Sequence, residues 1–513
     1  MENNNAQNKQ TMLTLFTSMF AMVVTIAVNF FLSPYIVKTL GEEANGFTQL
    51  ANNFVNYAAL ITVALNSMAG RFVTIHYYKG DIKESNKFYS SVMIANVAII
   101  VILIIPATIL LFALENVINI STANVLHVKI LFAFVFFNFF ISQINSVFGI
   151  ATYVSNKQYM VNTINSIKTV LNAVCLLFIF SIFAPKIYYV SMVAGLLTFI
   201  TVPVYFGISK KILPELKLNF KYFSIKTIWT VFSSGIWNVV THCGILLMTG
   251  VDLLLANLYL GPVAMGVLSV SKVMPNCIAQ IAGNVNASFS PNLTIAYAED
   301  KSGKVLNSLR YAMKCSSILV SIPIMVLCVY GKSFYSLWQP TLDANILAVL
   351  SFWACVQYIP FAGPQVLNNV YTTANKLKLN STTVLLGGVI NVLLVIVLVK
   401  STNLGLFAIA SISAIISIVR NIFFTVPYTA KILNLKWYTF YKDVLISCIC
   451  CAINGVFCVL FHFLIKPSSW IKLIISVFCA CVVSLICMFI ILLSNEEKSQ
   501  LIKKFRRKSN GQG

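Results

Sequence analysis

Charged residues are scarce in this 513-residue chain, at 10% of the sequence, and the acidic ones are scarcest, with 14 Asp and Glu against 36 Lys and Arg. Soluble globular chains carry about 25% charged residues. The shortage excludes a soluble enzyme, and the 58% of hydrophobic residues excludes a disordered chain. Because a spanning helix needs about 20 apolar residues, the composition predicts an all-α polytopic membrane protein with about 14 transmembrane helices.

Motifs of enzymatic chemistry are also missing. The sequence contains no G-x-S-x-G nucleophile elbow, no P-loop and no H-E-x-x-H zinc helix. The 13 cysteines lie in apolar stretches, and the C-x-x-C pair Cys448 and Cys451 lacks the second pair that a zinc site would need. We therefore expect no enzymatic activity, no cofactor and no metal site. The function class that remains is a secondary transporter.

Fourteen apolar segments are predicted to span the membrane. They cover residues 12–36, 47–69, 88–113, 125–150, 159–182, 187–207, 228–257, 263–289, 307–330, 344–371, 380–399, 403–429, 443–465 and 470–493.

The basic residues between these spans predict the orientation. With the N-terminus inside, the cytoplasmic segments hold 26 Lys and Arg and the outer loops hold 6. Loops rich in Lys and Arg stay on the cytoplasmic side. We expect a multi-pass protein of the bacterial cytoplasmic membrane with both termini cytoplasmic. The surplus of positive charge then reflects topology and contact with membrane lipids, and we expect no nucleic-acid partner.

An internal repeat predicts the architecture. The pattern L-G-x-x-x-x-G begins at Leu40 and again at Leu260, and Thr74 opens a four-residue segment that recurs from Thr294, with one offset of 220 residues. At an offset of 219, Asn156-Lys157 recurs as Asn375-Lys376 and Ser146 corresponds to Gln365. The offset contains six predicted helices, an even number, so the two halves have the same orientation and form parallel pseudo-repeats.

We therefore predict two six-helix lobes and an appended pair of helices. The N-terminal lobe covers residues 1–207, and the C-terminal lobe covers 227–432. Residues 208–226, the basic linker, connect them on the cytoplasmic side, and residues 433–513 hold helices 13 and 14 with a basic tail.

Polar side chains form stripes on several predicted spans and indicate a hydrated cavity between the two halves. Polar groups inside a membrane are costly and usually line a cavity or bond a neighbouring helix. We predict that a substrate contacts cationic and amide side chains on these stripes, namely Lys168, Lys272, Arg420, Asn52, Asn56 and Asn276. Snorkelling towards the membrane surface is the alternative for Lys168 and Lys272, and helix pairing is the alternative for Arg420.

Asp252 is the acid deepest within a predicted span, and His242 lies on the same helical face. Both are candidates for coupling transport to a sodium ion or a proton. The sequence leaves a second interpretation open for each: Asp252 pairs with a basic residue, or His242 is a hydrogen-bonded polar group without a relay role. Three buried bases against one buried acid favour an anionic substrate such as a phosphate.

These features together resemble the multidrug/oligosaccharidyl-lipid/polysaccharide exporter superfamily. The resemblance rests on the segment from Pro34 to Gly41 that closes helix 1, on Val251-Asp252 and the glycine motif that follows, and on Arg420-Asn421 with Pro427-Tyr428. Within that superfamily the chain looks most like the polysaccharide transporter branch.

The resemblance implies alternating access and a cationic cavity that holds the pyrophosphate of a lipid-linked glycan, with Lys168, Lys272 and Arg420 as headgroup ligands and Asp252 as an ion-coupling site. The multidrug antiporters of the superfamily commonly use a carboxylate in helix 1, whereas residues 12–36 contain no charged side chain. A cation-coupled multidrug antiporter is therefore the second hypothesis. A membrane-embedded glycan polymerase is a third and weaker one, because no large outer loop is present to carry catalytic residues.

Overall fold

The computed structural model describes residues 2–120, 125–298 and 302–492, and these residues form helices and turns without a strand. Thirteen of the helical stretches in these ranges are long and apolar enough to span a membrane. A shorter apolar helix, α15 (Ala344–Val356), lies where the tenth span was expected. The predicted all-α polytopic membrane protein with about 14 spans is confirmed. The predicted basic tail lies outside the described residues.

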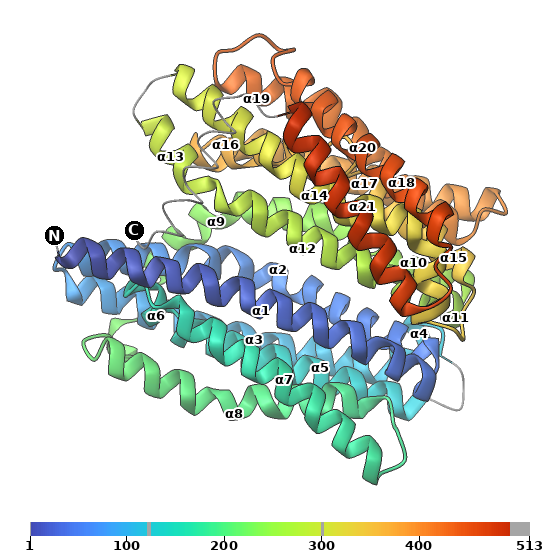
Figure 1. Cartoon of the computed structure of the whole chain (residues 1–513). Helices are drawn as coiled ribbons and strands as arrows, with labels where there is room; N and C mark the ends of the chain where they lie inside the picture. Colours follow the sequence, from blue (N-terminus) through green and yellow to red (C-terminus); the bar gives the residue numbers. More distant parts are fainter. Residues whose placement is uncertain (1, 121–124, 299–301, 493–513) are drawn as a thin grey trace. The chain divides into compact units, whose positions relative to one another are not determined.

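Packing divides the chain into two compact units, Met1–Val273 with Leu377–Ser413, and Met274–Lys376 with Ala414–Gly513 (Figure 1). The lobe boundaries predicted from the internal repeat are not tested by this division and stay a prediction. Unit 1 contains α1 (Glu2–Leu40), α2 (Glu42–Tyr78), α3 (Ile82–Phe112), α4 (Leu114–Val117), α5 (Val125–Phe148), α6 (Ile150–Val154), α7 (Gln158–Ile182), α8 (Tyr188–Ile212), η2 (Phe220–Tyr222), α9 (Ile225–Ile245), η3 (Leu246–Gly250), α10 (Asp252–Leu260), α11 (Pro262–Ser271), α17 (Leu377–Ser401) and the first part of α18 (Leu406–Arg420).

Unit 2 holds the remaining helices. These are α12 (Val273–Ser288, but for its first residue), α13 (Ser290–Ala298), α14 (Ser302–Trp338), α15, η4 (Pro364–Leu367), α16 (Asn368–Thr373), the end of α18, η5 (Asn421–Thr425), α19 (Val426–Ile432), α20 (Tyr441–Ile465) and α21 (Trp470–Leu492).

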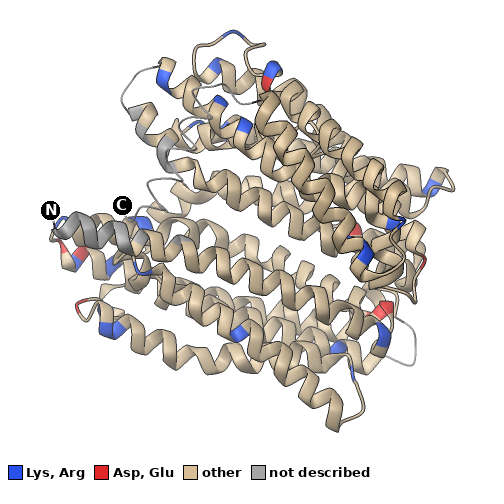
Figure 2. Cartoon of the chain, in the orientation of Figure 1, with Lys and Arg blue, Asp and Glu red and all other residues tan. Residues whose placement is uncertain are grey.

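Long helices pack side by side within each unit. In unit 1, α1 packs on α7, α5 packs on α8, and α2 contacts α3, α9 and α11. In unit 2, α14 packs against both α15 and α20, and α20 packs against α21. Figure 2 shows Lys and Arg mainly at helix ends and in connecting segments, with long uncharged stretches between them. This distribution is the one expected of helices that lie in lipid.

The tenth span is not the single helix predicted over 344–371. Helix α15 ends at Val356, and turns lead from there into η4 and α16. Pro360 and Pro364 cannot donate backbone hydrogen bonds, which weakens a helix here. Gly363 then lies so close to α14 that a Cβ atom on it would meet Met313 O at 2.2 Å and Ser317 Oγ at 2.1 Å. The chain leaves the helix to make this close approach.

The internal repeat is visible in the backbone. Gly41 has a φ of 85° and its counterpart Gly261 has a φ of 91°. Gly41 is the N-cap residue of α2, and Gly261 is the N-cap residue of α11. Asn156 and Asn375 are likewise matched, with φ values of 54° and 53°. Positive φ is rare outside glycine and asparagine. The repeated residues therefore preserve two repeated turns.

Each unit also contains the same amide network. In unit 1, Asn66 donates to Gln143 Oε1 at 2.8 Å and accepts from Asn96 at 3.1 Å. In unit 2, the network is formed by the corresponding Asn286, which donates to Gln365 at 3.0 Å and accepts from Ser316 at 3.0 Å. Gln365 thus accepts a hydrogen bond from Asn286 as Gln143 does from Asn66. The offset of 219 residues matches Gln365 with Ser146, but in this hydrogen-bond network the counterpart of Gln365 is Gln143.

The second glycine of each L-G-x-x-x-x-G motif, Gly46 in one and Gly266 in the other, lies where α2 crosses α11. A Cβ atom on Gly46 would lie 3.0 Å from Gly266 Cα, and one on Gly266 would lie 2.6 Å from both the carbonyl carbon and oxygen of Glu42. Small residues allow helix backbones to approach closely in membranes. The repeated glycines therefore fix the crossing of the two related helices.

We predict that Gly266→Ala destabilises the protein by about 1–3 kcal/mol, the usual range for overpacking, because the backbone of Glu42 cannot move aside as a side chain could. Thermal unfolding in detergent measures the change. Gly283→Ala is the matched control, since nothing lies within 4 Å of a Cβ atom at that helical glycine. Equal stability of the two variants would contradict the close-packing argument.

Candidate functional site

Asp252 and Lys272 form a buried ion pair in unit 1. Lys272 Nζ lies 2.5 Å from Asp252 Oδ2 and also donates to the carbonyl of Thr249 at 3.1 Å. The side chain of Asp252 is 2% exposed and that of Lys272 is 17% exposed. An isolated carboxylate at this depth would be strongly disfavoured. Each charge is therefore neutralised by the other.

The ion pair adjoins a π-helical turn, η3, which interrupts the seventh span between α9 and α10. Asn53 Nδ2 and the hydroxyl of Tyr57 both donate to the carbonyl of Gly250, at 2.8 and 2.7 Å. The amide of Asn391 donates to two further carbonyls of the turn, both at 3.1 Å. Single π-helical turns are frequent at functional sites. Here α2, α10, α11 and α17 converge on one turn.

Helix ends place the two charges of the pair. Asp252 is the first residue of α10, where the positive end of the helix dipole favours a carboxylate. Lys272 caps the C-terminus of α11, where the negative end of the dipole favours an ammonium group. The turn at Gly261 reverses the chain between these helices and allows the two ends to meet.

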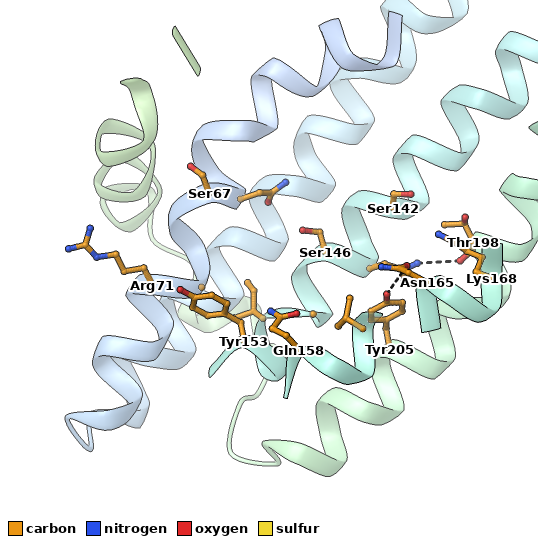
Figure 3. Close-up of a pocket in the computed structure, with 16 residues that line it drawn as sticks. Ser67, Arg71, Ser142, Ser146, Tyr153, Gln158, Asn165, Lys168, Thr198 and Tyr205 are labelled. Atoms are coloured by element: carbon orange, nitrogen blue, oxygen red, sulfur yellow. Dashed lines mark hydrogen bonds between the residues drawn. The ribbon is translucent and has the colours of Figure 1, made fainter. Parts of the chain in front are cut away.

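A polar cavity of about 420 Å³ lies elsewhere in unit 1, among α2, α5, α6, α7 and α8 (Figure 3). Its lining includes amide and hydroxyl side chains that can both donate and accept hydrogen bonds. Figure 3 shows Arg71 and Lys168 at opposite ends of a row that contains these polar groups. The polar lining residues include Asn66, Ser67, Ser142, Asn145, Ser146, Gln158, Asn165 and Thr198.

The charge of this cavity is positive. Arg71 and Lys168 are the charged residues among those described as lining it, and none of the others is acidic. Within the described parts of the chain, no carboxylate lies at salt-bridge distance from either cation. Arg71 is exposed and Lys168 is half-buried. The two positive charges are therefore available to an anionic ligand.

Hydrogen bonds hold the wall of the cavity in place. Asn145 Nδ2 donates to the hydroxyl of Thr201 at 3.0 Å and to the carbonyl of Thr198 at 3.3 Å. The hydroxyl of Tyr205 donates to Asn165 Oδ1 at 3.4 Å. These bonds link α5 and α7 to α8. The polar wall is thus fixed before a ligand binds.

The predicted cationic residues occupy different places. The structure brings Lys272 together with Asp252 and places Lys168 in the cavity instead. Arg420 belongs to unit 2, where it is half-buried and donates to Asn421 Oδ1 at 2.9 Å, at the start of the π-helical turn η5. Their roles in binding a substrate stay predictions.

The other predicted residues are exposed side chains. Asn52 and Asn56 lie on α2, and Asn52 donates to the carbonyl of Thr48 in its own helix. His242 is exposed on α9, and Asn276 is exposed on α12 of unit 2. The structure does not assign them a ligand, so the substrate contacts of the asparagines and the relay role of His242 stay predictions.

Sequence reasoning missed four residues that the structure brings into these two centres. Arg71 was counted only as a basic residue of a cytoplasmic segment, although it lies four residues after Ser67 on one helical face. Asn53 and Tyr57 have the same spacing on α2, which could have indicated a shared target. Asn391 lies in an apolar span and gave no periodic signal.

We predict that Lys272→Gln lowers stability by about 3–5 kcal/mol, because it leaves the carboxylate of Asp252 buried without a counter-charge. Asp252→Asn should be milder, since Lys272 is more exposed and keeps its bond to Thr249. The double variant should recover much of the loss. Thermal unfolding of all three proteins measures the coupling, and additive losses would show that the pair does not act as a unit.

Comparisons with known proteins agree with this architecture, although no protein-family model matches the chain. The uncharacterized membrane protein EpsK of Bacillus subtilis (strain 168) is 28% identical over 491 residues, which cover 95% of this chain and 96% of EpsK.

Two solved structures share the fold. One is a multidrug resistance MATE family transporter of the MOP superfamily in an inward-facing conformation, with a TM-score of 0.64 and 11% identity over 87% of this chain and 98% of that protein. The other is the lipid II flippase MurJ in an inward closed conformation, with a TM-score of 0.63 and 14% identity over 93% of this chain and 98% of MurJ. The chain therefore has the fold of the MOP superfamily, the multidrug/oligosaccharidyl-lipid/polysaccharide exporters that its sequence resembles.

Proposed function

We propose that this protein is a secondary transporter that flips a lipid-linked oligosaccharide, carried on polyprenyl pyrophosphate, across the bacterial cytoplasmic membrane by alternating access. The observation that carries the proposal is the polar cavity of unit 1, whose charged lining residues, Arg71 and Lys168, are both cationic. The fold, which MurJ shares, supports the proposal.

The charge of the cavity suits a pyrophosphate. Moving a phosphate from water into a partly enclosed space is costly unless cationic donors replace its hydration. Arginine presents a planar fork that matches phosphate oxygens, and lysine supplies a point charge. In this proposal Arg71 and Lys168 hold the diphosphate, and the prenyl chain stays in the lipid.

The uncharged part of the lining suits the glycan. Sugar hydroxyls both donate and accept hydrogen bonds, and the side chains of Asn66, Asn165 and Gln158 can do the same. The volume of about 420 Å³ falls in the usual range for small-molecule sites, about 300–1,000 Å³. The cavity thus has room for the headgroup and the first sugar rather than for a whole polysaccharide.

A cationic drug would meet an unfavourable field in the same cavity. Residues 12–36 carry no charged side chain, and the carboxylate of Asp252 is already neutralised by Lys272. Neither place offers a free anion to a cationic substrate. The glycan substrate is therefore favoured over the multidrug substrate, and the coupling ion, sodium or proton, stays part of the proposal.

We predict that Arg71→Gln and Lys168→Gln each weaken transport of a polyprenyl-pyrophosphate oligosaccharide. Loss of one charge-assisted hydrogen bond is worth about 1.5–3 kcal/mol, or roughly 10- to 150-fold in affinity. Translocation of a labelled lipid-linked oligosaccharide in proteoliposomes measures the effect. Glutamine keeps polarity and most of the side-chain length, so both variants should fold.

Lys83→Gln is the control, because it removes a lysine of unit 1 that does not line the cavity. Lys272→Gln distinguishes a loss of affinity from a loss of folding, because it should lose transport through instability, whereas the cavity variants should be stable and transport more weakly. Parental rates in both cavity variants would overturn the proposal. Uptake of a cationic drug by the parent, without glycan translocation, would favour the antiporter hypothesis.

A further inference from the structure

Side chains of α3 hold the basic linker in place. They form hydrogen bonds with its backbone, as a neighbouring strand would do in a sheet. Asn86 donates to the carbonyl of Glu215 at 3.0 Å and accepts from the amide of Lys217 at 2.8 Å. Ser90 donates to the carbonyl of Lys217 at 3.1 Å and accepts from the amide of Asn219 at 3.1 Å. Each side chain thus satisfies two backbone groups of an extended segment.

Ser91 repeats the arrangement further along. It donates to the carbonyl of Tyr222 at 3.3 Å and accepts from the amide of Ser224 at 3.0 Å. Ser90 and Ser91 are fully buried and Asn86 is nearly so, which shields these bonds from water. The linker therefore has a fixed path, and its lysine side chains leave it at fixed positions.

A cavity of about 670 Å³ lies between this segment and the ends of α3, α5 and α8. Aromatic rings and two ammonium groups face it, from Tyr89, Phe148, Phe206, Tyr222, Lys210 and Lys217. Lys210 Nζ lies 4.5 Å from the centre of the Phe206 ring, so the lysine stem runs along an apolar wall. The cavity thus combines positive charge with apolar surface.

The positive charge is not cancelled locally. Glu215 is the acidic residue of the basic linker, but it does not line the cavity. Within the described parts of the chain, neither Lys210 nor Lys217 has a carboxylate at salt-bridge distance. Two cations that form no ion pair within the described part of the chain favour an anionic occupant.

Exposed apolar side chains follow directly after the cavity. Phe220 is 83% exposed, Ile225 is 71% exposed and Trp229 is 68% exposed. The segment connects two helical stretches that are long and apolar enough to span a membrane, so we expect these side chains at the membrane surface. Large apolar groups beside lysines are typical of segments that rest in the lipid headgroup region. The occupant thus needs both an anionic group and an apolar part.

We infer that the basic linker binds an anionic phospholipid of the cytoplasmic leaflet, with the phosphate held by Lys210 and Lys217. The acyl chains lie along the exposed apolar side chains of the linker and of α9. Bound lipid stabilises the junction between α8 and α9. The site is separate from the cavity of Arg71 and Lys168, and it does not depend on the transported substrate.

The test uses the full-length protein in detergent and a pair of double variants. Lys210→Gln with Lys217→Gln removes the two cavity lysines. Lys211→Gln with Lys221→Gln removes the same charge from the same linker, at positions that do not line the cavity. Phosphatidylglycerol is titrated against each protein, with phosphatidylcholine as the neutral lipid, and bound lipid is counted by native mass spectrometry.

We expect phosphatidylglycerol to raise the unfolding temperature of the parent and of the control variant. The cavity variant should bind it at least about tenfold more weakly, as expected for a lost charge-assisted bond, while its unfolding temperature without lipid stays at the parental value. Equal losses in the two double variants would show only non-specific attraction and would overturn the site. Equal stabilisation by inorganic phosphate alone would assign the cavity to a soluble anion and overturn the lipid.

Discussion

Lipid offers no hydrogen bonds, so a polar group buried in a spanning helix must find its partner within the protein. The π-helical turn η3 is where this constraint is strongest, because it frees carbonyls in the middle of the seventh span. Asn53, Tyr57, Asn391 and Lys272 supply the missing donors. Helices distant in sequence are thereby tied to one turn, and Asp252 next to it receives its counter-charge. The contacts that pack these helices together therefore also bring Lys272 to Asp252.

The constraint separates two classes of cation. Lys272 is paired with Asp252, and its positive charge compensates the negative charge of the buried carboxylate. Arg71 and Lys168 meet no carboxylate among the described residues, yet they face a polar cavity. Water can hydrate them while the cavity is empty, and an anion can replace that water at little cost. A cation without a partner in a wet cavity is therefore better suited to a ligand than one already paired in a dry site.

Local features of the fold could be predicted from the sequence, and distant contacts could not. Span lengths follow from bilayer thickness, and the repeated turns at Gly41 and Gly261 follow from the special backbone freedom of glycine. The pairing of Asp252 with Lys272 depends on how α10 and α11 fold back on each other, which no periodicity reveals. The break near Gly363 depends on the surface of α14.

Arg71 shows why the cavity itself was missed. A hydropathy argument ends a span where charge begins, so the second span was predicted to stop at residue 69. The helix continues to Tyr78, because backbone hydrogen bonds do not depend on side-chain charge. Arg71 therefore projects from a rigid helix rather than from a loop, and it lines the same cavity as Ser67, one turn earlier. The membrane boundary and the helix boundary are different quantities, and Arg71 lies in the interval between them.

The same distinction applies to the basic linker. In the predicted topology, the five lysines of residues 208–226 help to orient the chain through an electrostatic attraction that needs no fixed geometry and is screened over about 10 Å. Recognition of a particular phosphate needs cations at fixed positions, and that requirement is met only where the backbone is held. Asn86, Ser90 and Ser91 hold it at Lys217, and α8 holds Lys210. In the proposed site, rigid support thus gives Lys210 and Lys217 the fixed positions that binding of a phosphate requires.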